Sequence, residues 1–305
     1  MRLATYQHGD ETGLGVIIGS QLYDLAASAA QLGHPRPPAD MLGLIDDPVP
    51  GLSMCREISA AASSLTPRPL AGVRLLAPIP RPRQNVLCVG RNYLDHIAES
   101  GDTGPAAVIP DHPMFFTKRA SSVVGPGAGI PWRADLTSDL DWEAELGIVI
   151  GTGGRDIAEA DAHRHIFGLT CINDVSAREV QISRHGGQFF KGKSLDGSCP
   201  MGPWIVTWDE FENPPELDIA CRVNGTPKQS SNTRNMIFSI ARIISELSAG
   251  MTLEPGDVIA SGTPDGVGVH RRPAEALAPG DVVEIEIASI GILRNHVVAA
   301  ASQTA

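Results

Sequence analysis

The stretch from Asp141 to Ile150, DWEAELGIVI, holds two glutamates at a spacing that suits metal binding. Apolar residues alternate with Glu143 and Glu145, as they do in a β-strand. Successive side chains of a strand point to opposite faces, so both carboxylates project from one face, about 7 Å apart along the backbone. Neighbouring carboxylates repel each other unless positive charge lies between them, and a divalent cation supplies that charge. An edge strand carrying two hydrated glutamates has the same pattern, because this spacing is common.

His96 and Glu99 form a second pair that could do chemistry. They follow the short apolar strand Val86–Val89 and Asn92, which can cap a helical turn. On a helix, residues three apart share one face, so the two side chains come within contact distance. A carboxylate beside an imidazole fixes its tautomer and raises its basicity, which suits a base that activates water. An exposed helical His–Glu pair is the simpler interpretation of these two residues taken alone.

Further polar residues stand at the ends of predicted elements. The apolar strand Phe167–Val175 ends on Asp174, and Arg178 and Gln181 share one face of the helix predicted to follow it. Lys191 and Lys193 lie among turn-forming residues, where a lysine is usually a solvated charge. The glycine-rich segment 261–268 lacks the lysine and spacing of a Walker loop, so we expect its glycines to let the backbone approach a small ligand.

The composition narrows the class of protein. The 305 residues are 42% hydrophobic and 19% charged, as in an ordinary soluble protein, and 32 glycines and 24 prolines favour turns and short strands. The net charge of −11 argues against nucleic acid or an anionic membrane as partner. Five scattered cysteines without C-x-x-C spacing exclude a zinc knuckle or a disulfide scaffold. We see no apolar run long enough for a membrane span and no signal peptide, and therefore expect a cytoplasmic protein.

The chain is predicted to divide near residue 80. Strands are expected at 2–6, 13–19 and 21–25 and a helix at 55–65, before proline-rich segments at 66–69 and 78–82. The glycine- and proline-rich segment 101–113 is long enough for a lid. The clearest helix is Asn235–Gly250, with an apolar stripe that includes Met236 and Ile240. Two turn-into-strand signals follow it, at 255–259 and 279–283.

Taken together, residues from about 83 to 298 resemble the catalytic domain of the fumarylacetoacetate hydrolase family. Six segments carry the resemblance in the family's order: Val89–Tyr93 with His96 and Glu99, Trp142–Leu146, Asn173–Arg178, Lys191–Asp196, Asn235–Phe238 and Ser261–Gly268. The resemblance implies a mixed, β-rich α+β fold. The family's β-roll catalytic domain would occupy residues 81–305, after a small N-terminal α+β domain at 1–80.

The resemblance also implies roles for individual residues. Glu143, Glu145 and Asp174 match the family's metal-binding positions, for one Mg²⁺ or Mn²⁺ per chain, with Ca²⁺ also compatible. Hard oxygen ligands suit these cations better than zinc. The remaining matches are the water-activating pair His96 and Glu99, the substrate-binding and polarising residues Arg178, Gln181 and Lys193, Thr263 in the glycine loop, and Lys118, expected in the same pocket.

The implied reaction is metal-dependent hydrolysis of a 2,4-dioxo acid such as an acylpyruvate or fumarylpyruvate. His96 would deprotonate the water that attacks the 4-carbonyl, and C3–C4 cleavage would give a carboxylic acid and pyruvate. Fumarylacetoacetases proper carry a further metal-binding carboxylate shortly before this histidine, and Leu87–Arg91 contains none. That departure argues against fumarylacetoacetate as the substrate.

Other outcomes remain open at the level of sequence. The same site could decarboxylate oxaloacetate, or isomerise or hydrate a 2-hydroxy-diene dioate, because these reactions share an enolate and differ in the pocket walls. A non-enzymatic β domain with a structural Ca²⁺ is a quite different interpretation. Members of the family commonly form homodimers, and we expect one here.

Overall fold

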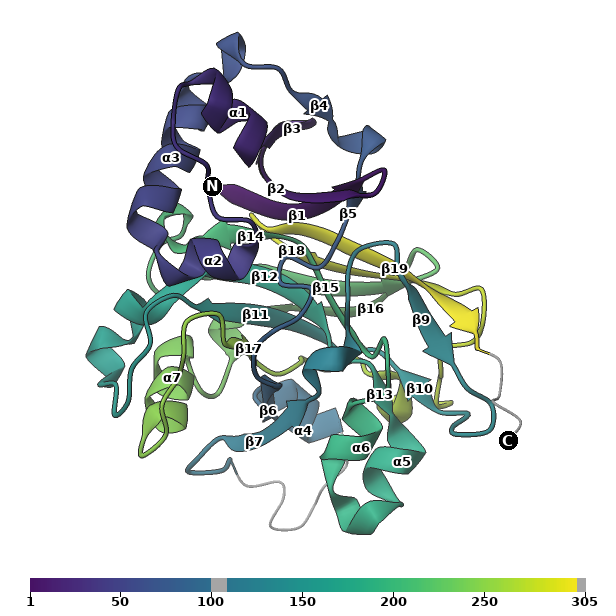
Figure 1. Ribbon diagram of the computed structural model, residues 1–305. Coiled ribbons are helices and arrows are strands. Elements are labelled where there is room, and N and C mark those ends of the chain that lie inside the picture. Colours follow the sequence, from purple (N-terminus) through teal and green to yellow (C-terminus); the bar gives the residue numbers. More distant parts are fainter. Residues whose placement is uncertain (100–108, 301–305) are drawn as a thin grey trace.

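The computed structural model describes residues 1–99 and 109–300, and a 12-stranded sheet is its main element (Figure 1). The strands follow the order β4-β3-β2-β1-β14-β12-β11-β17-β6-β7, with β5 paired to β1 and β8 to β14. Their bounds are β1 Arg2–His8, β2 Glu11–Ile18, β3 Gln21–Asp24, β4 Arg68–Pro69, β5 Arg74–Leu75, β6 Val86–Gly90, β7 Met114–Lys118, β8 Val123–Val124, β11 Ala144–Ile150, β12 Ile166–Asn173, β14 Cys199–Thr207 and β17 Val258–Ala260.

Two smaller sheets, seven α-helices and several short 3₁₀ helices make up the rest of the described fold. The five-stranded sheet has the order β16-β15-β18-β19-β9, and β10 pairs with β13. These strands are β9 Gly129–Trp132, β10 Leu140–Asp141, β13 Ser176–Ala177, β15 Asp218–Val223, β16 Thr226–Asn232, β18 Val282–Ile287 and β19 Gly291–Ala299. The helices are α1 Leu25–Gln31, α2 Met41–Asp46, α3 Pro48–Ala60, α4 Leu94–Glu99, α5 Arg178–Ile182, α6 Phe189–Lys193 and α7 Ile240–Ser248. The mixed, strand-rich α+β fold predicted from the sequence is confirmed.

The central strand β11 is buried on both faces. Leu146, Ile148 and Ile150 join a core cluster shared with the five-stranded sheet and α7, while Val149 joins a second cluster with α1, α2 and α3. Strands covered on both faces are apolar at nearly every position, which explains the LGIVI run. The alternative of a solvent-facing edge strand with hydrated glutamates is therefore wrong.

The N-terminal strands extend the main sheet. Arg2 pairs with Val206 and Leu3 with Ile205, so β1 continues the sheet beyond β14 (Figure 1). The helices α1 to α3 pack against the face of the main sheet on which Val149 lies. The three predicted N-terminal strands are confirmed, whereas the division into two domains near residue 80 stays a prediction.

Several helix predictions need correction. The helix expected at 55–65 runs from Pro48 to Ala60. It can begin at Pro48 because proline is tolerated in the first turn of a helix. The helix expected at 235–250 begins only at Ile240, where the Ser239 side chain accepts a hydrogen bond from the backbone of Arg242. Met236 therefore lies outside it, after a 3₁₀ turn.

Two further expectations concern loops. Lys191 and Lys193 lie on the short helix α6 rather than in an open loop. Most of the lid predicted at 101–113 lies outside the described residues, and 109–113 form neither helix nor strand. In the described part of the chain, no helix has the length and apolar character needed to cross a membrane.

Candidate active site

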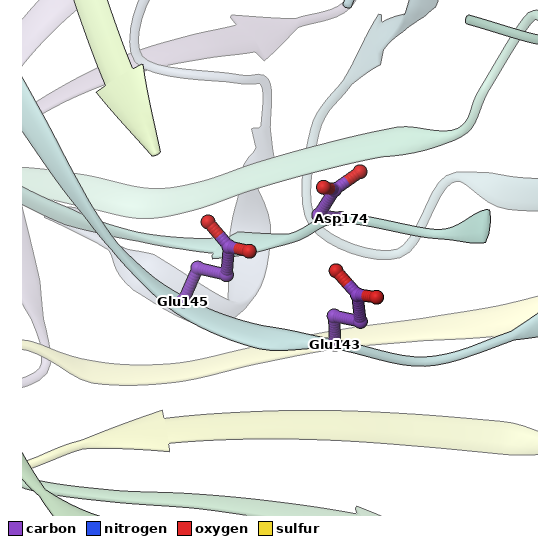
Figure 2. Close-up of side chains that lie close together, drawn as sticks. All are labelled: Glu143, Glu145 and Asp174. Atoms are coloured by element: carbon purple, nitrogen blue, oxygen red, sulfur yellow. The ribbon is translucent and has the colours of Figure 1, made fainter. Parts of the chain in front are cut away.

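Three carboxylates meet where β11 begins and β12 ends (Figure 2). Ala144 pairs with Asn173 in this antiparallel ladder, so Glu143 and Asp174 are neighbours across it, and the Asp174 N–H donates to the Glu143 carbonyl at 2.9 Å. One carboxylate oxygen from each of Glu143, Glu145 and Asp174 lies within 4.8 Å of the others. The three side chains are 4%, 1% and 0% exposed, so solvent does little to relieve their repulsion.

Basic side chains neutralise two of these carboxylates. Lys193 Nζ donates to Glu143 Oε2 at 2.7 Å and to Asp174 Oδ2 at 2.8 Å. Lys118 Nζ holds the other Asp174 oxygen at 2.6 Å, and Arg178 Nη1 lies 2.7 Å from Glu143 Oε1. Burial alone would raise the pKa of Glu143, but Lys193 and Arg178 outweigh it and hold that pKa well below its usual range. Glu143 is therefore ionised.

Glu145 is the carboxylate that the protein leaves uncompensated. No ion pair joins it to a basic group among residues 1–99 and 109–300, and its Oε2 accepts only the Gly262 N–H at 2.9 Å. Burial, followed by the nearby Asp174 and Glu143, raises the pKa of Glu145 well above the usual range. A divalent cation would supply the missing positive charge, and three carboxylate oxygens form a donor set that Mg²⁺ or Mn²⁺ accepts. The residues present fit such an ion.

Arg178 is held by a fourth buried carboxylate, Asp141. Asp141 Oδ2 accepts from Arg178 Nε at 2.8 Å and from the Val269 N–H at 3.0 Å, while Oδ1 accepts from the Trp142 and Gly268 N–H groups. Burial opposes ionisation, but Asp141 and Glu143 raise the pKa of Arg178, which remains charged. Its Nη2 is buried and has no hydrogen-bond partner in the described part of the chain. The N–H groups of Nη2 therefore lack an acceptor from the protein in this part of the chain.

His96 and Glu99 are joined as the spacing predicts. His96 Nδ1 and Glu99 Oε1 are 2.7 Å apart on α4, and the side chains are 13% and 18% exposed, so the pair is not a solvated surface pair. Glu99 Oε2 also accepts the Gly266 N–H at 2.8 Å, which ties the pair to the glycine-rich loop. When Nδ1 donates to Glu99, Nε2 is left as the basic nitrogen.

A cavity of about 320 Å³ brings these groups together. The residues that line it include His96, Glu143, Glu145, Arg178, Gln181, Lys193 and Thr263, with apolar walls from Met114, Phe116, Ile182 and Phe189. A wider groove of about 620 Å³ between Leu70–Leu75 and the outer face of β19 contains none of them. Glu143, Glu145, His96 and Arg178 therefore place the candidate site in the smaller cavity.

Lys118 does not line this cavity, contrary to expectation. Its side chain is 0% exposed and contacts Asp174 Oδ1 and the Val175 carbonyl. Lys118 therefore balances the charge of Asp174 from inside the core, and its ammonium group does not face a ligand.

Three residues near the site were missed in the sequence. Asp141 stands two residues before Glu143, and the same strand periodicity that pairs the glutamates would have indicated it. Gln229 connects the Ala144 N–H, at 2.9 Å, to Thr263 Oγ1, at 2.8 Å, but it comes from β16 in the other sheet and has no local signal. His270, whose ring lies 5.9 Å from that of His96, also lines the cavity.

Known proteins share both the sequence and the architecture of this chain. The pattern of the family described as "Fumarylacetoacetate (FAA) hydrolase C-terminal" matches residues 85–298. The oxaloacetate tautomerase YisK of Bacillus subtilis (strain 168) is 48% identical over 228 residues, covering 75% of this chain and 74% of that protein. The mitochondrial oxaloacetate tautomerase FAHD2A of Bos taurus is 40% identical over 302 residues, covering 98% and 92%.

Solved structures agree over nearly the whole length. A fumarylacetoacetate hydrolase from Exiguobacterium antarcticum superposes with a TM-score of 0.83 at 41% identity, covering 98% of this chain and 100% of that chain. The maleylpyruvate hydrolase from Sphingobium sp. SYK-6, solved with manganese(II) and pyruvate, has a TM-score of 0.78 at 33% identity, covering 99% and 100%. The chain therefore belongs to the fumarylacetoacetate hydrolase family.

Proposed function

We propose that this protein is a divalent-cation-dependent enzyme that interconverts the keto and enol forms of oxaloacetate. The observation that carries the proposal is one cavity lined by His96, Glu143, Glu145 and Arg178. Directly behind this lining, Asp174 completes the cluster of three carboxylates and Glu99 holds the His96 ring. The names of the two relatives, both oxaloacetate tautomerases, support the choice of substrate. The sequence-based hypothesis put acylpyruvate hydrolysis first and had decarboxylation of oxaloacetate as an alternative, so the substrate proposed now is that of the alternative, with tautomerisation as a different reaction.

Glu143, Glu145 and Asp174 would hold the Mg²⁺ or Mn²⁺. When bound, the cation would act as a Lewis acid that polarises the 2-oxo group and makes the neighbouring C3 protons more acidic. The manganese in the maleylpyruvate hydrolase structure supports an ion at this type of site.

The chain's own residues would bind the substrate and move the proton. Arg178, which lines the cavity, would donate from Nη2 to the C1 carboxylate. His96 Nε2, with its tautomer set by Glu99, would take a proton from C3. The C3–H electron pair then forms the C2–C3 double bond, and the carbonyl pair moves onto the C2 oxygen. The imidazolium returns its proton to that oxygen to give the enol, and the reverse sequence gives the keto form.

Lys193 would stabilise the negative charge that develops on the C2 oxygen. Its ammonium group lines the cavity and touches Glu143 and Asp174, two of the proposed metal ligands. Burial lowers the pKa of Lys193, but Asp174 and Glu143 raise it by more, so the amine remains protonated. Thr263, held by Gln229, and Gln181, which accepts from Arg178 Nη1 at 3.1 Å, would complete the polar wall.

Hydrolysis of an acylpyruvate-type 2,4-dioxo acid is the second candidate. The maleylpyruvate hydrolase with bound pyruvate supports it, because that protein shares the fold at 33% identity. His96 would then deprotonate a water molecule instead of carbon, and the C3–C4 bond would break with pyruvate enolate as leaving group. The two reactions differ in the atom that gives up its proton.

A panel of 2-oxo acids distinguishes these functions. The purified full-length protein with Mn²⁺ would be offered the enol of oxaloacetate, acetylpyruvate and fumarylpyruvate, with a chelator control and a control of Mn²⁺ alone. Enol absorbance reports tautomerisation, and enzymatic detection of pyruvate reports hydrolysis or decarboxylation. We expect accelerated enol loss without pyruvate release. Pyruvate formation from acetylpyruvate, with no effect on the enol, would instead establish the hydrolase.

Two variants test the role of the metal ion and the role of the base independently in this assay. Glu143→Ala should abolish both Mn²⁺ binding and turnover, because it removes one of three ligands. His96→Ala should bind Mn²⁺ normally and lose turnover; persistent turnover would refute the role of His96 as base.

We also propose that the protein is a homodimer, as members of the family commonly are, and that it is cytoplasmic and binds neither nucleic acid nor membrane, as its composition suggests. Light scattering coupled to size-exclusion chromatography tests the dimer. A monomer that retains full activity would overturn it.

A further inference from the structure

His270 lines the cavity beside His96, yet the chemistry above gives it no role. It ends the 3₁₀ turn Gly268–His270, directly after the glycine-rich loop, and its half-buried side chain lines the cavity. Its ring centroid is 5.9 Å from that of His96, with the two planes tilted by 54°. A second imidazole therefore stands beside the proposed base.

The backbone that carries His270 is rigidly held. Asp141 accepts the N–H groups of Gly268, at 2.7 Å, and Val269, at 3.0 Å. A Cβ on Gly268 would lie 2.2 Å from the Glu275 carbonyl oxygen, so only glycine fits there. Because Asp141 also holds Arg178, one carboxylate holds both the guanidinium and the backbone that leads into His270.

The imidazole of His270 has unused hydrogen-bonding capacity. Across residues 1–99 and 109–300 no group hydrogen-bonds to its ring nitrogens, and His96 is its aromatic neighbour. Burial lowers the pKa of His270, and the neighbouring His96 and Arg178 lower it further against the opposing effect of Glu99. The neutral ring keeps one N–H donor, which in a partly buried cavity needs an acceptor.

The position of that donor relative to the base indicates the acceptor. In a four-carbon 2-oxo dicarboxylic acid, the C4 carboxylate is bonded directly to C3, the atom that His96 would deprotonate. With C1 at Arg178 and C3 at His96, the C4 carboxylate lies next to the atom that His96 would deprotonate, and the His270 ring, 5.9 Å from that of His96, lines the same part of the cavity. A 2-oxo acid without a second carboxylate, such as pyruvate, has no group there and would leave the N–H unpaired.

We propose that His270 is a specificity-determining residue that selects 2-oxo dicarboxylic acids by donating a hydrogen bond to the carboxylate distal to the 2-oxo group. The proposal rests on the proposed function for the location of C1 and C3. It goes further by assigning the second carboxylate to one side chain. Arg91, which also lines the cavity, is the competing candidate for that carboxylate.

Malate and lactate test this assignment without turnover. Both are 2-hydroxy acids, which lack the 2-oxo group and therefore cannot tautomerise. Malate carries a distal carboxylate on C3, and lactate does not. Titration calorimetry on the Mn²⁺-loaded full-length protein gives the ratio of their affinities. A hydrogen bond to a charged group corresponds to roughly tenfold to a hundredfold in affinity, so we expect wild type to prefer malate by about that factor.

Substitutions at His270 should change only the ratio of the malate affinity to the lactate affinity. His270→Phe keeps a ring but removes the donor and should bring the malate-to-lactate ratio close to one, with lactate affinity unchanged. His270→Gln keeps a donor and should retain part of the preference. His296→Gln, on the outer face of β19, is the matched control and should behave as wild type.

Three outcomes would overturn the proposal. One is a malate preference that survives in His270→Phe, and another is a preference lost in Arg91→Gln but kept in His270→Phe. The third is the absence of any preference in wild type. Because these are binding measurements, they are independent of the enol assay: a missing tautomerase activity with an intact malate preference would overturn the reaction and leave the assignment of His270 standing.

Discussion

Replacing Asp141 with asparagine is the most informative single perturbation of this site. The side chain is 1% exposed, and its two oxygens accept four hydrogen bonds, two at Oδ1 from backbone N–H groups and two at Oδ2 from the Val269 N–H and Arg178 Nε. Asparagine has nearly the same shape but only one acceptor oxygen. If that oxygen takes the place of Oδ1, an amide donor faces the Val269 N–H and the guanidinium.

The expected loss in the free energy of unfolding follows from these contacts. Removing one partner of a buried ion pair destabilises a protein by about 3–5 kcal/mol, because the other charge stays buried. Arg178 retains Glu143, which moderates the loss, while two buried donors without an acceptor cost about 1–3 kcal/mol each. We therefore expect Asp141→Asn to lower the free energy of unfolding by about 3–5 kcal/mol. The KM for the 2-oxo acid should rise, because Arg178 is no longer held.

Equilibrium urea unfolding of the metal-free protein measures the first effect, and steady-state kinetics the second. Asp161→Asn is the matched control, because its ion pair with Arg164 is exposed on both sides and exposed pairs contribute little. A free energy of unfolding for Asp141→Asn within about 1 kcal/mol of wild type would refute the reasoning, since buried pairs of this kind exceed that value.

Further predictions concern the ion and the base. Glu145→Gln should abolish Mn²⁺ binding without destabilising the metal-free protein, because the amide oxygen can still accept the Gly262 N–H; calorimetry and thermal unfolding measure both, and retained Mn²⁺ affinity would contradict the ligand assignment. Since the pKa of Glu145 is raised, Mn²⁺ affinity should increase with pH and binding should release a proton, seen as an enthalpy that depends on the buffer's ionisation enthalpy. For the same group the folded state binds more protons than the unfolded state, so its contribution to the stability of the metal-free protein falls as pH rises above the usual glutamate range; a stability that rose in that window would be the opposite result. Glu99→Gln should lower kcat by roughly a hundredfold to ten-thousandfold while His96 stays in place, the range of general-base catalysis, and a kcat near wild type would show that Glu99 does not orient the base.

Local periodicity in the amino-acid sequence determines two of the arrangements in this site. The alternation around Glu143 and Glu145 places both carboxylates on one side of a strand, and three-residue spacing places His96 beside Glu99. Both arrangements depend only on backbone geometry within a few residues. The order of six short segments was sufficient to identify the family.

The tertiary structure decided what lies around those groups. The burial of β11 on both faces, the position of Lys118 behind Asp174, and the bridge from Gln229 to Thr263 all join residues far apart in the chain. The same holds for Asp141, whose four donors include two from the turn at Gly268. Hydrophobic patterns and turn signals report on neighbours in sequence, whereas charge compensation and cavity walls depend on which distant elements pack together. The sequence therefore determined which groups could act, and the packing of the sheets determined their charge states and their neighbours.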